Sequence, residues 1–370
     1  MFRKILVAGT LVAAMSFSAG PATAEGKKLI LGTPGIPPIF AATLPIVAEK
    51  MGFFKKYGAD VEVKFMESGT AAARALVSGD VDLALAPTPQ VTAQTSNADV
   101  DFVALYGLPH PDFLLGSTDP KKASCKDVIG QTVGVDAIGG ARSVALRIML
   151  GACGVKSEDV QEIALPSVAT QQAMIADRIT FGVLHIDEIP ALERQGKSIT
   201  VVTSIKQASP SSHFAMITVR GDHLKAERQA YVRAIAGIIE AARFMKDPKN
   251  ADRFAEIATV TGRTKDEAKS ALQKLEAIGF FPADDNGLDR KQIESVIAIQ
   301  VKNGNIRPGK QPVKYDRLVD ETIWRDAMAL VSKYSFLTCR VFTLLRDCIW
   351  SAPVRSYYGP LRCETRLRIH

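Results

Sequence analysis

Residues 66–87 read MESGTAAARALVSGDVDLALAP and predict a helix followed by a buried strand. Ser68 or Thr70 can begin the helix, because a hydroxyl oxygen accepts a hydrogen bond from an early backbone N–H. The helix is expected over about 70–77. Ser-Gly-Asp then interrupts the pattern, and the apolar run 81–86 ends at Pro87. Such a run, bounded by turn residues, is typical of a strand inside a parallel sheet.

The preceding residues repeat this alternation of strand and helix. Residues 29–31 form a short apolar run, and Leu44, Val47, Ala48 and Met51 have the i, i+3, i+4, i+7 spacing of an amphipathic helix. Residues 61–65 alternate in the manner of a strand. Strands that alternate with helices predict βαβ units and a parallel sheet.

A similar pattern recurs 98 residues later, over 166–185, PSVATQQAMIADRITFGVLH. Upstream of it, 132–135 is an expected strand, a helix follows Gly139-Gly140, and 159–163 is expected to be the next strand. The order matches that of the first segment and predicts two similar α/β lobes. Chance similarity of two ordinary α/β segments is the alternative.

Two stretches are candidates for crossings between the lobes. One runs through 107–118 between expected strands at 102–106 and 113–115, and the other runs through 206–218 into an expected strand at 211–219. The remainder, about 222–330, is expected to be helical, with helices over 231–245, 251–260, 265–278, 290–303 and 320–331. Lobe 1 should therefore comprise 25–112 and 213–334, and lobe 2 should comprise 113–212.

The first 24 residues have the pattern of a secretory signal peptide. MFRK is basic, ILVAGTLVAAMSF is apolar, and Ala22-Thr23-Ala24 is a small-residue cleavage site. A membrane anchor is the alternative, but the apolar run is short for a span. We expect a monomeric protein that is exported to the periplasm and cleaved after Ala24.

The net charge of +7 is concentrated at the two ends of the chain. Residues 335–370 contain six arginines, one aspartate and one glutamate, and no lysine. The body is close to neutral, which gives no support for a nucleic-acid partner. The tail is expected to lie outside the fold, and a short helix over 341–350 that packs on the body is the alternative.

Two cysteines, Cys125 and Cys153, lie in the body of the chain. An exported protein could join them in a disulfide. Two separately buried thiols are the preferred interpretation, since sequence does not place their Cα atoms. Neither is expected to touch a ligand.

Three stretches are similar to a known family: LGTPGIPPIFAATLPIVAEKMGFFKKYGADVEV at 31–63, ALVSGDVDLALAP at 75–87 and GQTVGVDAIGGARSVALRIML at 130–150. They resemble the periplasmic solute-binding proteins of ABC importers, within the group that binds sulfonates, taurine, nitrate or the pyrimidine precursor of thiamine. The resemblance covers about 28–330. It implies a type II-like fold with two lobes, a small solute between them, a membrane permease as partner, and no cofactor.

Candidate ligand contacts follow the expected strands, because ligands of open parallel sheets sit beyond the strands' carboxyl ends. The candidates of lobe 1 are all neutral, whereas lobe 2 also brings titratable side chains. Together the candidates are Thr33, Pro34, Phe40, Ser68, Gly69, Thr70, Pro87, Thr88, Gly139, Gly140, Ala141, Arg142, His185, Asp187 and Glu188. Taken singly, each could equally be a cap, a turn or a surface residue.

Arg142 gives this set a chemical preference. A guanidinium beside a glycine pair at a helix start can bind a carboxylate, sulfonate or nitrate with two hydrogen bonds. We therefore expect an anionic ligand, although Asp187 and Glu188 could instead bind an amino group. An enzyme of the same fold that acts on a pyrimidine precursor or a small aromatic acid is the rival function, with His185 and Asp187 as its acid and base. A sensor ectodomain is a third.

Overall fold

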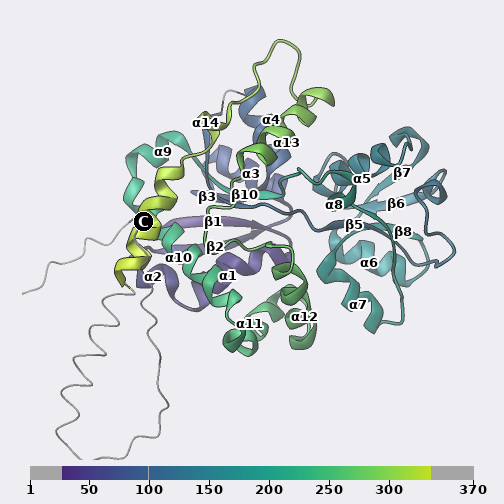
Figure 1. The fold of residues 1–370 in the computed structure, drawn as a ribbon, viewed down its shortest axis with the longest axis horizontal. Helices are drawn as coiled ribbons and strands as arrows, with labels where there is room; N and C mark the ends of the chain where they lie inside the picture. The colour runs from purple at the N-terminus through teal and green to yellow at the C-terminus, as the bar shows by residue number, and fades with distance from the viewer. Residues whose placement is uncertain (1–26, 99, 335–370) are drawn as a thin grey trace, which may run out of the picture.

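The computed structural model describes residues 27–98 and 100–334. The expected signal peptide and the expected atypical tail lie outside these residues. The described chain forms two sheets flanked by helices, which lie side by side in Figure 1. No helix in this part of the chain combines the length and the apolar character needed to cross a membrane.

The first sheet has the strand order β2-β1-β3-β10-β4. Its strands are β1 (Leu29–Pro34), β2 (Val61–Met66), β3 (Leu83–Pro87), β4 (Phe102–Leu108) and β10 (Ala215–Arg220). β1 pairs in parallel with β2 and β3, whereas β10 runs antiparallel to both of its neighbours. The predicted strand at 211–219 therefore begins four residues later than expected and occupies an inner position of this sheet.

The second sheet has the order β7-β6-β8-β5-β9 and repeats the arrangement of the first. Its strands are β5 (Phe113–Ser117), β6 (Thr132–Val135), β7 (Gln161–Ala164), β8 (Phe181–His185) and β9 (Thr200–Ser204). β6 is parallel to β7 and β8, and β5 is antiparallel to β8 and β9. The chain passes between the sheets after β4 and again before β10, at the two predicted crossings.

Helices cover both faces of the first sheet (Figure 1). Along β1, Leu29 and Leu31 join a core cluster with α1 and α10, whereas Ile30 packs toward the cluster of α3 and α13. This alternation follows from the two-residue repeat of a strand. The helices of this lobe are α1 (Thr43–Lys50), α2 (Phe53–Lys56), α3 (Gly69–Ser78), α4 (Thr88–Ala98), α9 (Gly221–Ala226), α10 (Arg228–Lys246), α11 (Ala251–Ala258), α12 (Lys265–Glu276), α13 (Arg290–Lys302), α14 (Tyr315–Leu318) and a last helix over 321–334.

The second sheet is covered in the same way, with α5 and α8 on one face and α6 and α7 on the other (Figure 1). These helices are α5 (Ala141–Ala152), α6 (Ser167–Ile175), α7 (Ile189–Arg194) and α8 (Ile205–Ala208). The α/β fold with two similar units agrees with the sequence prediction.

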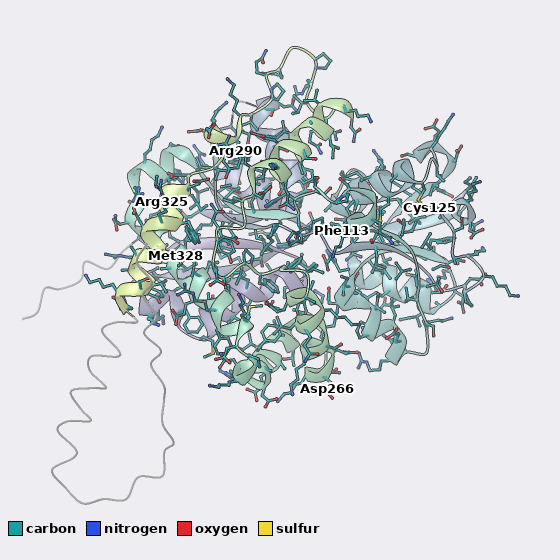
Figure 2. The ribbon with its side chains drawn as sticks, viewed as in Figure 1. Phe113, Cys125, Asp266, Arg290, Arg325 and Met328 are labelled. Atoms are coloured by element: carbon teal, nitrogen blue, oxygen red, sulfur yellow. A yellow bond between two sulfur atoms is a disulfide. The ribbon has the colours of Figure 1, made fainter. Side chains whose placement is uncertain are left out.

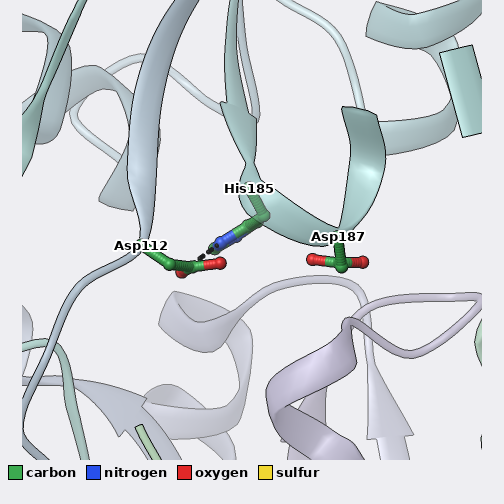
Figure 3. Close-up of side chains that lie close together, drawn as sticks. All are labelled: Asp112, His185 and Asp187. Carbon is green, nitrogen blue, oxygen red and sulfur yellow. Dashed lines mark hydrogen bonds and ion pairs between the residues drawn. The ribbon is translucent and has the colours of Figure 1, made fainter. Parts of the chain in front are cut away.

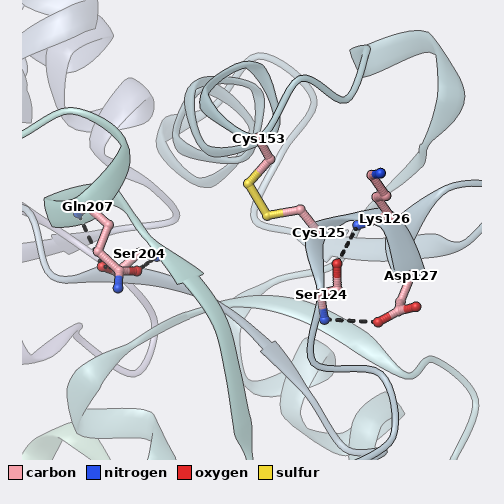
Figure 4. Close-up of a disulfide and its surroundings, with 7 residues drawn as sticks. All are labelled: Ser124, Cys125, Lys126, Asp127, Cys153, Ser204 and Gln207. Carbon is pink, nitrogen blue, oxygen red and sulfur yellow. Dashed lines mark hydrogen bonds between the residues drawn. A yellow bond between two sulfur atoms is a disulfide. The ribbon is translucent and has the colours of Figure 1, made fainter.

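Cys125 and Cys153 form a disulfide whose Cα atoms are 6.1 Å apart. Cys125 begins a short 3-10 helix, and Cys153 directly follows α5 (Figure 4). The expectation of two separate thiols is wrong, because the fold brings together two positions that are 28 residues apart in the chain.

Candidate functional site

A cleft of about 540 Å³ lies where the strand ends of the two sheets face each other. Its walls are the segments that follow β1, β2 and β3 on one side and β6, β7 and β8 on the other. Of the predicted ligand contacts, the cleft walls include Pro34, Ser68, Gly69, Pro87, Ala141, Arg142 and His185. The other predicted contacts are placed behind or beside these walls.

The first wall includes the start of α3. The Ser68 hydroxyl accepts a hydrogen bond from the Ala71 N–H at 3.1 Å, as the cap prediction requires. Gly69 lies directly against Pro87, since a Cβ at this glycine would come within 2.5 Å of the proline Cδ. The glycine therefore allows the helix start and the end of β3 to pack together at the cleft.

Two predicted contacts of the first lobe lie behind this wall. Thr33 is fully buried, and Phe40 packs edge-to-face on Phe254 with ring centroids 5.8 Å apart. Thr70, next to the cap, is half-buried and does not belong to the lining of the cleft. Thr33 and Phe40 are accounted for by the core of the lobe.

Thr88 is buried and holds a histidine in one of the crossings. Its hydroxyl lies 2.7 Å from His213 Nδ1, and His213 Nε2 lies 2.7 Å from the carbonyl oxygen of Gly287. The carbonyl can only accept, so Nε2 of His213 carries a proton. Burial lowers the pKa of His213 to about 4, which leaves the ring neutral at pH 7. Nδ1 therefore accepts a hydrogen bond from the Thr88 hydroxyl.

The opposite wall contains the start of α5. Gly139 has a positive φ of 74°, and Gly140 precedes the first helical residue. The Asp136 carboxylate accepts a hydrogen bond from the Arg142 backbone N–H at 3.1 Å. Helix starts attract anions, and here a carboxylate of the protein itself already takes up one of the N–H groups.

The Arg142 side chain forms a buried ion pair. Its guanidinium donates to both carboxylate oxygens of Glu188, at 2.9 and 3.0 Å, and to the Val183 carbonyl at 2.5 Å. Both side chains are almost fully buried. This differs from the expected single cation that faces a ligand anion, because the partner carboxylate lies 46 residues further along the chain.

Glu188 has further partners, so its charge is also compensated. Gln171 Nε2 and the His185 backbone N–H each donate to the carboxylate at 2.8 Å. Burial raises the pKa of Glu188, but the Arg142 guanidinium more than offsets this effect and holds the pKa at about 2. Glu188 is therefore ionised and engaged within the protein, and the alternative that it binds a ligand amino group gains no support.

His185 faces the cleft at the end of β8 and is tied to a crossing. Its Nδ1 lies 2.7 Å from Asp112 Oδ1 (Figure 3). Asp112 Oδ2 accepts a hydrogen bond from the Ile186 backbone N–H at 3.2 Å. Burial lowers the pKa of His185, and the Asp112 carboxylate raises it by more, so the net shift is upward. The imidazole also packs on Phe113 and Phe214, with ring centroids 4.4 and 5.9 Å away.

Asp187 connects the two lobes. Arg263, between α11 and α12, donates to the Asp187 carboxylate at 2.6 Å and to its backbone carbonyl at 3.0 Å. A second inter-lobe pair joins Arg194 of α7 to Glu267 of α12 at 2.9 Å. Asp187 therefore acts as a contact between lobes and is not part of the cleft lining.

Asp112, His185 and Asp187 could in principle hold a metal, since one ligand atom from each lies within 4.8 Å of the others (Figure 3). The Asp112 oxygens are already bonded to His185 and Ile186, and Asp187 is paired with Arg263. A divalent cation would also lie close to the Arg263 guanidinium. We therefore assign no metal to this group.

Sequence reasoning missed several residues that shape the site. No local sequence pattern marks Asp112 or Arg263, since their partners, His185 and Asp187, lie more than 70 residues away in the chain. Asp136 carried a usable signal, because it directly follows a predicted strand. Phe113 stands between the two lobes at the start of β5 (Figure 2).

The arrangement is suited to binding. The cleft walls are mainly apolar, and the buried charges beneath them are paired within the protein. Such pairing holds the charged side chains in fixed positions. Recognition of a ligand by this cleft would then depend mainly on shape.

Comparison with known proteins gives three findings. The family model described as "NMT1/THI5 like" matches residues 40–251. A Brucella abortus (strain 2308) protein named "Putative binding protein BAB2_1146" is 22% identical over 242 residues, which are 65% of this chain and 73% of the relative. Similar solved structures include the periplasmic nitrate-binding protein NrtA from Synechocystis PCC 6803, with a TM-score of 0.65, 17% identity and coverage of 82% of this chain and 88% of NrtA.

The alkanesulfonate-binding protein SsuA from Xanthomonas axonopodis pv. citri, solved with bound MOPS, is similar to the same degree. Its TM-score is 0.65 at 15% identity, with coverage of 80% of this chain and 99% of SsuA. At these identities the structural likeness shows the fold, which is that of periplasmic binding proteins.

Proposed function

The chain belongs to the NMT1/THI5-like family, and from this premise we propose that it is the exported solute-binding component of an ABC importer. It captures one small solute between its lobes and delivers it to a permease in the inner membrane. Its solute belongs to the range bound by the resembling group, which spans sulfonates, taurine, nitrate and pyrimidines. We propose that the protein acts as a monomer in the periplasm.

One observation carries this proposal. A cleft of about 540 Å³ lies between the facing strand ends of two similar sheets, and within residues 27–98 and 100–334 the chain crosses between these sheets twice. Two units joined in this way can rotate toward each other around a bound molecule. The closed form then differs in shape from the open one, so a permease can recognise it.

A thermal-shift screen of the purified chain tests the proposal. A ligand that binds only the folded state stabilises it by RT ln(1 + L/Kd), where L is the free ligand concentration, so the melting temperature rises with the logarithm of this concentration once it exceeds the dissociation constant. Positive compounds are confirmed by titration calorimetry, and the recovered ligand is analysed by mass spectrometry. We expect saturable one-to-one binding with the ligand recovered unchanged. Conversion of the ligand would contradict a pure binding role and support an enzyme of the same fold.

A further inference from the structure

We propose that the solute of this cleft is neutral and has an extended apolar body, and that this body reaches beyond the cleft into a small apolar cavity beside the two crossings. This inference rests on the proposed function and narrows its range of solutes. It excludes inorganic oxyanions and all sulfonates, because these carry an anionic group at pH 7.

The charges around the cleft carry the first step. Arg142 is engaged by Glu188, and His185 is engaged by Asp112. An anion in the cleft would have to compete with Glu188 and Asp112 for the hydrogen-bond donors of Arg142 and His185. Removing an anion from water without new partners is strongly unfavourable.

The start of α5 gives the second step. Asp136 lines the cleft and already accepts the Arg142 backbone N–H. A ligand anion at this position would meet a like charge instead of a free helix start. A neutral group that donates a hydrogen bond, such as an amide, would find an acceptor there.

Arg74 is the other cation of the cleft wall among the described residues. It is exposed on α3, and Glu67, exposed near the start of the same helix, also lines the cleft. Exposed charges are screened by water and salt, and two of opposite sign largely cancel at a distance. Arg74 therefore gives the cleft little preference for anions.

A second cavity carries the third step. The apolar cavity has a volume of about 40 Å³, and most of its lining residues are apolar, among them Pro111, Phe113, Phe214, Val296 and Ile299. Ser212, His213 and Gln300 are its polar lining residues. A cavity needs roughly 10–15 Å³ to hold one water-sized group, so about three such groups fit. A cavity whose walls are mainly apolar favours apolar groups.

The two spaces are neighbours. Pro87, Ala141, Phe113 and Phe214 line both the cleft and the apolar cavity. A solute whose polar end lies near Asp136 can therefore extend past these side chains without crossing the protein backbone. Because each buried methylene group contributes roughly 0.8 kcal/mol, affinity should rise about fourfold per added methylene until the cavity is filled.

Titration calorimetry with matched probes tests the inference. The probes are linear primary amides of three to eight carbons and the carboxylates of the same chain lengths, at pH 7. We expect each amide to bind more tightly than its carboxylate, and affinity to increase with length over about three methylene groups before it levels off. Tighter binding of the carboxylates, or of nitrate or ethanesulfonate, would overturn the inference and leave the proposed function in place.

A variant pair on α13 tests the cavity itself. Ile299→Phe should fill the apolar cavity, which weakens the longer amides at least tenfold and leaves the shortest amide within about twofold. Val301→Phe is the matched control, since Val301 is exposed on the same helix and does not line the cavity. Circular dichroism confirms that both variants fold. Equal affinities for the long amides in the two variants would contradict the path into the cavity, and binding of no probe or screened solute would contradict the proposed function as well.

Discussion

Arg142 and Glu188 illustrate how a single pair can matter more for stability than for recognition. Both are almost fully removed from water, and the two hydrogen bonds between them are nearly equal in length. A buried pair adds little compared with apolar residues of the same size. Removing one member is costly, because the remaining charge has lost its partner.

We expect Arg142→Met to lower the free energy of unfolding by about 3–5 kcal/mol. Urea denaturation measures this loss. The double variant Arg142→Met/Glu188→Gln should recover part of it, because no uncompensated carboxylate remains and the amide oxygen can still accept from Gln171. Arg147→Met, on the following turn of α5, is the control. The Arg147 side chain is 45% exposed, although its partner Glu162 is only 10% exposed, so this pair should contribute less than the buried pair, about 1 kcal/mol. A loss equal to that of the control would contradict the role of the buried pair.

His213 should make the protein sensitive to acid. Its pKa is about 4 in the folded state because it is buried, against about 6.5 for an unperturbed histidine. Between these values the unfolded chain takes up a proton that the folded protein does not. Stability therefore falls as the pH is lowered through this window, by up to about 3 kcal/mol.

The measurement compares the unfolding free energies of the parent and His213→Gln between pH 7 and pH 4.5. The variant should be less stable at pH 7, since the bonds to Thr88 and Gly287 are lost, but it should lose less on acidification. His185, whose pKa is raised, acts in the opposite sense: its contribution is complete below about pH 6.5 and is lost as the pH rises through its folded pKa. Parallel pH profiles of parent and variant below pH 6.5 would show that His213 does not carry the acid effect.

The positions of these residues along the chain explain what sequence reasoning could reach. Ser68 as a cap and Arg142 at a helix start follow from local spacing, and both positions are found as predicted. That Glu188 would face Arg142, or Asp112 would face His185, depends on strands that approach only after folding. Long-range pairing is not encoded in local patterns, so the chemical character of the cleft could not be predicted.

At the scale of elements, helix α4 shows why one segment was missed. No helix is predicted from the sequence between Pro87 and the strand at 102–106, although Thr88–Ala98 is helical. The buried face of α4 contains Val91 and three hydroxyl residues, Thr92, Thr95 and Ser96. Their hydroxyls donate to backbone carbonyls of the preceding turn. A helix with polar residues in its buried face lacks the apolar period that identifies amphipathic helices. By contrast, the apolar residues of the strand at 132–135 and of helices α12 and α13 follow recognisable patterns. The ends of these elements were predicted to within about two residues.

The disulfide should stabilise the second lobe without affecting binding. The link between Cys125 and Cys153 closes a loop with a sequence separation of 28 residues. Chain-entropy arguments assign about 3–4 kcal/mol to a loop of this size. We expect Cys125→Ser/Cys153→Ser to lower the free energy of unfolding by about 3–4 kcal/mol. Ligand affinity should change by less than about twofold, because neither residue lines the cleft.

Denaturation with and without a reducing agent measures the effect. The reductant should destabilise the parent to the level of the double variant and leave the variant unchanged. An affinity loss of tenfold or more would show that the disulfide shapes the cleft.

At the scale of the whole molecule, the two lobes are connected by a few defined contacts. The chain crosses between β4 and β5 through residues 109–112 and returns after α8 through residues 209–214. Two ion pairs link the first lobe to the second on one side: Arg263, just before α12, pairs with Asp187, and Glu267 of α12 pairs with Arg194. Few covalent connections and a small number of polar bridges allow rotation of one lobe relative to the other.

We therefore expect a saturating ligand to make the protein more compact. Small-angle X-ray scattering of the purified chain, with and without the ligand from the screen, should show a smaller radius of gyration in its presence. A non-binding compound of similar size serves as the control. An unchanged radius at full saturation would count against closure of the lobes.

The inner position of β10 also determines the order in which the molecule can assemble. The second sheet is built from one uninterrupted stretch of chain, whereas the first sheet lacks the strand between β3 and β4 until residue 220 has been made. On a growing chain, the later lobe can thus complete its sheet before the earlier one. The N-terminal segments must wait, with β3 unpaired on one side, for a strand that arrives more than 120 residues afterwards. Nascent chains that stop short of β10 should consequently depend on chaperones, because an exposed apolar strand edge invites aggregation.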